Sequence, residues 1–241
     1  MEEESPASVD IITADGDVVL WIEDRDQGIS QRFRCTRALL RKNSKYLDVL
    51  LDPNKFREGI STEDRLNQLK QEYGSVKDIP SHVLPVVRVV ELPNISAKAP
   101  ALKQLLVIVL SIINGIDQEW PISETRAIEK LLQIALLADR LDALDMVKRF
   151  IERHLKQQPL PKPKKEITVR QQLLLGTLMG ISSYVEWSSA LLIVRGSKLW
   201  LHEELSDDFV DVSEKDAAWN CLPGGLEGQP HAWFTHGIES D

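Results

Sequence analysis

The chain has 241 residues, a formal net charge of −8 and two cysteines. This length suits one or two domains with a core that needs no disulfide or metal. Cys35 and Cys221 form no Cys-x-x-Cys pair, which favours a reducing intracellular compartment, nuclear or cytoplasmic. The acidic balance argues against nucleic acid as the main partner. The most apolar stretch, 105–113, is too short to cross a bilayer, and the acidic N-terminus lacks the apolar run of a signal peptide.

The first third of the chain predicts a hairpin that leads into a helix. Residues 1–12 are expected to form a flexible acidic N-terminus. Residues 17–22 and 31–35 are rich in β-branched or alternating apolar residues and flank a polar turn, which predicts two antiparallel strands. From residue 38 to 51 the apolar residues recur at separations of three, four and seven, as in a helix. We expect a break at Asn43-Ser44 and an end at Asp52-Pro53.

An insertion, 57–83, separates this helical stretch from the next strand. Ser61 and Gly74 can cap a helix whose narrow apolar stripe consists of Leu66, Leu69 and Tyr73. We predict a surface helix with limited burial. The stripe is either a ridge that binds a partner or the side of a loop that packs on its own domain.

The following segments predict a strand over 86–92, an apolar helix over 99–113 and, after Ser123, two helices that meet near Asp139-Arg140. Strands followed by helical pairs favour an α+β domain over residues 13–156. Residues 157–165 are a Pro- and Lys-rich linker, solvated or usable as a weak nuclear-import patch.

The C-terminal third consists of a helical extension, 166–205, and an acidic and aromatic tail, 206–241. The tail carries Trp219, Trp233 and Phe234. These aromatic residues can either anchor in a groove of a partner or fold back onto the helical extension.

A search for reactive groups predicts no catalytic residue, no cofactor site and no metal site. The sequence contains neither a phosphate-binding glycine loop nor a Gly-x-Ser-x-Gly elbow. His231, His236 and Cys221 match no established zinc spacing. Asp139, Asp142 and Asp145 recur every third residue, which favours a solvated helix face over a pair of catalytic carboxylates. Cys35 lies on the apolar face of its strand, so we expect a buried, inert thiol.

The order of these elements resembles the BTB/POZ domain, particularly its fungal forms. The residues that carry the resemblance are Gly16-Asp17-Val18-Val19-Leu20, Phe33, Arg37-Ala38-Leu39-Leu40, Ser44-Lys45-Tyr46-Leu47 and the helical segment 131–155. The resemblance implies a small β-sheet flanked by a cluster of α-helices and followed by a helical C-terminal extension. It also implies a buried charge pair, Asp17 with Arg37. Loss of such a pair through Asp17→Ala costs ~3–5 kcal/mol; alternatively, the two charges lie exposed at strand ends.

The resemblance also suggests a partner. Some BTB domains bind a cullin scaffold through a hydrophobic-x-Glu motif just after the helix that corresponds to residues 38–51. Phe56-Arg57-Glu58 is similar to this motif. Phe56 can instead cap the core. We therefore expect a non-enzymatic interaction module, an adaptor or complex subunit, with substrate adaptor for a cullin-type ubiquitin ligase as one role. A nuclear scaffold or chromatin-associated subunit is the alternative, and a hydrolase is the least favoured class. Homodimers are a family habit, but the short acidic segment before Asp17 also fits a monomer in a hetero-complex.

Overall fold

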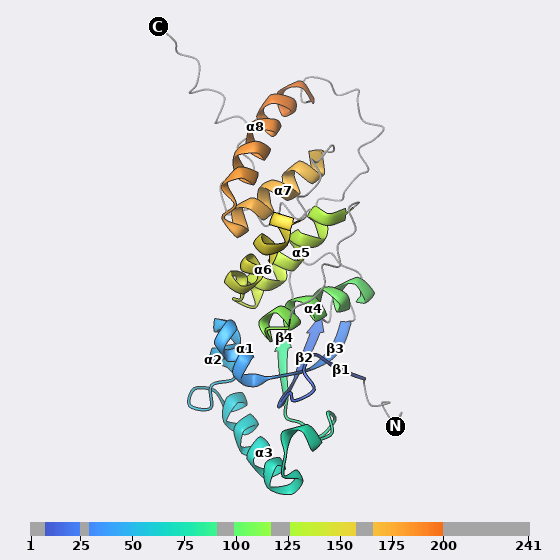
Figure 1. Ribbon diagram of the computed structural model, residues 1–241, viewed down its shortest axis with the longest axis vertical. Coiled ribbons are helices and arrows are strands. Elements are labelled where there is room, and N and C mark those ends of the chain that lie inside the picture. Colours follow the sequence, from blue (N-terminus) through green and yellow to red (C-terminus); the bar gives the residue numbers. More distant parts are fainter. Residues whose placement is uncertain (1–7, 25–28, 91–98, 117–125, 158–165, 200–241) are drawn as a thin grey trace. The chain divides into compact units, whose positions relative to one another are not determined.

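The computed structural model describes residues 8–24, 29–90, 99–116, 126–157 and 166–199 (Figure 1). The chain divides into two units, Met1–Leu160 and Pro161–Asp241. The first is an α+β unit with a mixed four-stranded sheet, and the second is helical where it is described. The predicted fold class is therefore confirmed.

The sheet has the strand order β1-β3-β2-β4. Its centre is the predicted hairpin, in which β2 (Val18–Asp24) and β3 (Ile29–Cys35) run antiparallel. The predicted third strand is β4 (Val86–Val90), which pairs parallel with β2 and forms one margin of the sheet. Alternation in these strands directs Leu20, Phe33 and Val87 into the core, where each is at most 1% exposed.

The other margin is a short strand, β1 (Val9–Ile11), which pairs parallel with β3. The expectation of a flexible segment over 1–12 is thus wrong for residues 8–12, while 1–7 lie outside the described residues. Two features favour a strand here despite the acidic character of this segment. The β-branched Val9 and Ile11 suit a pleated edge, and the Asp10 carboxylate pairs with Lys103 Nζ at 2.7 Å, which ties β1 to α4 (Ala99–Ile113).

The two-part helix consists of α1 (Arg37–Asn43) and α2 (Lys45–Leu50), so both the predicted break and the predicted end are confirmed. Ser44 separates them and serves both. Its hydroxyl oxygen accepts the Leu47 N–H at 3.0 Å, which caps α2, and its O–H donates to the Leu141 carbonyl oxygen at 2.5 Å. One small side chain therefore caps a helix and holds it against a segment far along the chain.

Three further helices of the first unit are α4, α5 (Ala127–Arg140) and α6 (Leu144–Gln157), and α4 packs against both of the others. The predicted meeting of two helices near Asp139-Arg140 is confirmed. At the corner between them, Asp142 adopts a left-handed backbone with φ 46°. The apolar sides of these helices form the core, with Leu106, Val109, Leu131, Leu137, Val147 and Ile151 all buried.

The insertion folds as α3 (Arg57–Tyr73) and a short 3-10 turn, η1 (Val76–Asp78). The helix begins at Arg57 rather than after Ser61, because the turn that ends α2 delivers the chain directly into it. Its end at Gly74, with φ 77°, is as predicted.

The stripe of α3 is buried, contrary to the prediction of limited burial. Leu66 and Leu69 are fully buried in a cluster with Val19, Ile79 and Leu84, and Tyr73 is half-buried against it. The partner-binding interpretation of Leu66, Leu69 and Tyr73 is therefore wrong, and packing on the own domain is confirmed. The cause is that the insertion covers the second face of the sheet, at Val19.

The second unit is a helical hairpin of α7 (Glu166–Met179) and α8 (Ser182–Leu199). A Cβ at Gly176 would lie 2.9 Å from Tyr184 Cβ, so only glycine allows this close approach. The predicted extension, 166–205, is thus helical up to Leu199. Residues 200–205, the tail 206–241 with Trp219, Trp233 and Phe234, and all of the linker 157–165 except Gln157 lie outside the described residues. In the part of the chain that is described, no helix is both long and apolar enough to span a bilayer.

Candidate functional site

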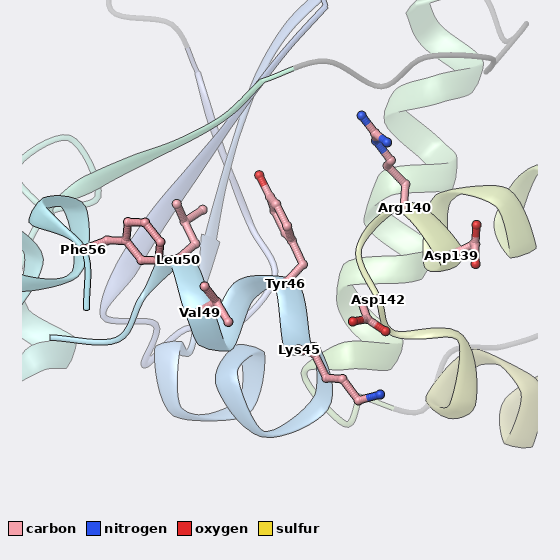
Figure 2. Close-up of a pocket in the computed structure, with 8 residues that line it drawn as sticks. All are labelled: Lys45, Tyr46, Val49, Leu50, Phe56, Asp139, Arg140 and Asp142. Carbon is pink, nitrogen blue, oxygen red and sulfur yellow. The ribbon is translucent and has the colours of Figure 1, made fainter. Parts of the chain in front are cut away.

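A groove of about 550 Å³ opens between α2, the turn that follows it and the corner between α5 and α6 (Figure 2). Eight residues line it: Lys45, Tyr46, Val49, Leu50, Phe56, Asp139, Arg140 and Asp142. All belong to the first unit. The groove therefore joins two segments that are almost a hundred residues apart in the sequence.

The wall of the groove is apolar because α2 carries large apolar residues on both sides. Leu47 is fully buried against the core, whereas Tyr46 and Val49 are 38% and 41% exposed. Phe56, directly before α3, is 47% exposed. Clusters of exposed large apolar side chains mark interaction sites on soluble proteins. The alternative that Phe56 caps the core is wrong, since about half of its surface is accessible.

Main-chain contacts fix the two sides of the groove relative to each other. The Lys45 N–H donates to the Asp142 carbonyl oxygen at 3.2 Å, beside the bond from the Ser44 hydroxyl to the Leu141 carbonyl oxygen. The left-handed backbone of Asp142 turns its carbonyl toward α2, a conformation that aspartate tolerates better than most residues. These hydrogen bonds thus hold the two sides of the groove together.

The turn that presents Phe56 is held by Asp52. Its carboxylate accepts the Asn54 N–H at 2.9 Å and pairs with Lys55 Nζ at 3.3 Å. The backbone bond from Asn54 is the main reason that the pKa of Asp52 lies below its usual value. Gly59 lets the first turn of α3 pack on this segment, because a Cβ there would lie 2.2 Å from the Asp52 carbonyl oxygen.

The charged residues lie along the rim on the helical side. In Figure 2 the Arg140 side chain extends toward the same open side as the Tyr46 hydroxyl, while Asp139 points away. Burial raises the pKa of Tyr46 and the positive charge of Arg140 opposes that shift, so the phenol stays protonated and can donate a hydrogen bond. The groove thus offers an apolar floor with polar contacts at one edge.

The three residues of the predicted motif lie together at the start of α3. Phe56 lines the groove, whereas Arg57 and Glu58 are exposed and lie outside the lining. Sequence reasoning missed Tyr46 and Val49 as site residues. The signal for them was an α2 segment with apolar residues on more than one side, KYLDVL.

The predicted charge pair of Asp17 and Arg37 is not formed. Asp17 Oδ1 accepts the backbone N–H of Arg37 at 2.6 Å, and the Arg37 guanidinium pairs instead with Glu63 of α3. The reason is local: Arg37 is the first residue of α1, where N–H groups lack a helical partner, and the insertion supplies the carboxylate of Glu63 to the guanidinium. Loss of Asp17 is therefore equivalent to loss of a helix cap, about 1 kcal/mol.

The buried arginine is Arg34, which is 5% exposed. Its guanidinium donates to the carbonyl oxygens of Gly16, Val76 and Ile79, over 2.9–3.1 Å, and to Ser81 Oγ at 3.3 Å. It thereby joins the hairpin to the insertion. The sequence signal was indirect. Arg34 shares a sheet face with Val19, and it is buried because a later segment, the insertion, covers that face.

Cys35 and the three regularly spaced aspartates have the burial and exposure expected of them. Cys35 is fully buried, and desolvation raises the pKa of its thiol to about 12, as expected of an inert cysteine. Asp139, Asp142 and Asp145 are exposed, as predicted for a solvated face. The described residues contain no group of three His, Cys, Asp or Glu that could hold a metal ion. His231, His236 and Cys221 lie outside them.

Comparisons of the chain with protein-family models, with curated proteins and with solved structures find no match.

Proposed function

We propose that the chain is a non-enzymatic protein–protein interaction module of the BTB/POZ type, an adaptor or complex subunit, that docks a partner in the groove. One observation carries the proposal. Tyr46, Val49 and Phe56 are 38–47% exposed around a preformed groove of about 550 Å³. Aromatic anchors beside a pocket are typical of the residues that dominate binding energy at protein interfaces.

The order of elements supports the BTB/POZ type. A hairpin, a two-part helix, a strand parallel to the first strand of that hairpin, an apolar helix and a closing helix pair follow one another in the first unit. This is the order that the sequence resemblance implies. The short strand β1 and the insertion, 57–83, are additions to it.

The proposed partner is a cullin-type scaffold, which makes the protein a substrate adaptor of a ubiquitin ligase. Phe56 provides an aromatic anchor in the groove, and Glu58 provides an exposed carboxylate two residues later. Tyr46 and Val49 extend the apolar contact surface. A partner that covers all four would bury a continuous patch instead of a three-residue motif alone.

Pull-down of a purified cullin with the full-length protein tests the proposal. We expect retention by the wild type and its loss with the double variant Phe56→Ala, Glu58→Ala, and also with Val49→Asp, which places a charge in the groove. Ile11→Ala is the matched control, because Ile11 is exposed on β1 at the far side of the sheet from β4. Equal recovery with all variants would remove the cullin as partner.

Co-purification from native extract then distinguishes the classes of complex. A cullin recovered with the wild type, and lost with the groove variants, supports the adaptor function. Chromatin or transcription subunits without a cullin would assign a nuclear scaffold instead. Turnover in an esterase or phosphatase panel would contradict the non-enzymatic assignment.

A further inference from the structure

The outer margin of the sheet at β4 is a second surface, separate from the groove. The strand order β1-β3-β2-β4 leaves β4 with one paired side and one side without a described neighbouring strand (Figure 1). The hydrogen bond from the Val19 N–H to the Pro85 carbonyl oxygen, at 2.9 Å, shows which residues of β4 direct their main-chain groups toward β2. In this pattern the N–H and C=O groups of Val87 form hydrogen bonds with β2. Those of Val86 and Arg88 point away from β2, toward the open edge of the sheet.

These outward main-chain groups are the standard acceptor and donor set for an added strand. Pro85 lies just before the strand and blocks none of them, since a proline lacks only its own N–H. Val86 is 48% exposed, which is high for a β-branched residue of a sheet. The margin is therefore accessible to solvent at Val86, where pairing would begin.

The side chains at this margin define the chemistry of an added strand. Arg32, Trp21 and Arg88 lie directly opposite one another across three strands, with both guanidinium carbons 5.0–5.1 Å from the centre of the Trp21 ring. Among the described residues, Glu23, paired with Arg88, is the one carboxylate that contacts this row. The Nε groups of Arg32 and Arg88 are buried and have no hydrogen-bond acceptor. Among the described residues, this row thus holds two guanidinium groups and one carboxylate.

The opposite sheet face at the same margin is apolar. Val87 and Val89 alternate with Arg88 and are buried on that face. Residues of an added strand would alternate in the same way. The residue beside Arg88 would face the arginine–tryptophan row, and its two neighbours would face the apolar side.

We propose that β4 receives an extended segment of a partner protein, in which an acidic residue beside Arg88 is flanked by apolar residues. Main-chain bonds to Val86 and Arg88 supply the affinity, and the carboxylate opposite Arg88 supplies the preference for acidic sequences. The groove takes no part in this contact.

Titration of the full-length protein with synthetic peptides tests the proposal. One eight-residue peptide alternates valine with glutamate, and the other alternates valine with lysine. We expect saturable binding of the glutamate peptide, at least about tenfold tighter than that of the lysine peptide. Addition of the glutamate peptide should slow hydrogen exchange at the backbone amides of residues 86 and 88. Equal affinity for both peptides, or binding without this protection, would overturn the proposal.

Two variants separate the main-chain and side-chain contributions. Val86→Pro removes an outward N–H that plays no part in the ladder to β2. It should weaken the binding of the glutamate peptide about tenfold. Arg88→Glu should transfer the preference to the lysine peptide. Ile11→Lys on β1 and Phe56→Ala in the groove should change neither affinity, so that failure here and failure of the proposed groove function are distinguishable. A dimer that Val86→Pro dissociates in sedimentation equilibrium would replace the partner segment by a second copy of the chain and overturn the proposal.

Discussion

At the scale of single residues, Arg34 connects more of the first unit than any other polar side chain described above. Its guanidinium reaches the hairpin at Gly16 and the insertion at Val76, Ile79 and Ser81. Burial lowers the pKa of Arg34, and the negative charges of Asp15 and Asp17 oppose that shift. Because the pKa of arginine lies so far above neutrality, the group stays charged and keeps its donors.

Arg34→Met should destabilise the protein by about 3–5 kcal/mol, because it removes the donors from three carbonyl groups at once, two of them in buried contacts. Urea unfolding followed by circular dichroism measures the change. Arg32→Met is the matched control on the same strand and the same sheet face, where the guanidinium is half-buried over Trp21. We expect about 1 kcal/mol for the control. Equal losses for both variants would contradict the role assigned to Arg34.

The buried thiol of Cys35 should lower the free energy of unfolding at alkaline pH. Burial raises the pKa of its thiol from 9.0 to about 12. Below pH 9 the thiol is protonated in the folded and unfolded states alike. Between about pH 9 and 12 the unfolded thiol ionises first, so the free energy of unfolding falls as the pH rises. Unfolding curves between pH 8 and 11 should show a smaller decrease for Cys35→Ala than for the wild type, and an equal decrease would exclude the buried thiol as a cause.

At the scale of secondary-structure elements, the contact between α3 and the turn that follows α2 decides the shape of the groove. Gly59→Ala places a methyl group only 2.2 Å from the Asp52 carbonyl oxygen, so α3 must move. We expect a destabilisation of about 1–3 kcal/mol and weaker docking of any groove partner. Gly115→Ala is the control, since a Cβ at Gly115 meets no atom within 4 Å and the strain there is only that of its backbone φ of 71°. Thermal unfolding and the pull-down together measure both effects, and unchanged docking by a folded Gly59→Ala would contradict this role of the contact.

The elements themselves were predictable where one local signal dominated. Alternation fixed the hairpin, Ser44 the break in the helix, and Asp52-Pro53 its end. The prediction was wrong for β1 because a three-residue strand has too few residues for a period, and its partner, β3, lies some twenty residues away. It was wrong for the burial of α3 because the stripe Leu66, Leu69 and Tyr73 is as narrow as that of a surface helix. Only the uncovered face at Val19 explains why this stripe is buried.

At the scale of the whole molecule, the division into two units follows the sequence closely, because a Pro- and Lys-rich segment separates two apolar regions. The groove was predictable only in part. Phe56 was found from its motif, but Tyr46 was assigned to the packed stripe, since a helix of six residues gives no clear phase. The contact of Lys45 with Asp142 joins segments too distant for any local pattern to indicate.

The attachment of the insertion through Arg34 has a consequence for how freely that segment can change. Arg34 binds the turn around Val76 through main-chain oxygens, and Lys77 and Asp78 are exposed. The side chains of Lys77 and Asp78 are therefore free to vary, while the number of residues between Gly74 and Ile79 is not. Substitutions at these two positions change the surface of the turn and leave its attachment intact, as long as Arg34 stays in place.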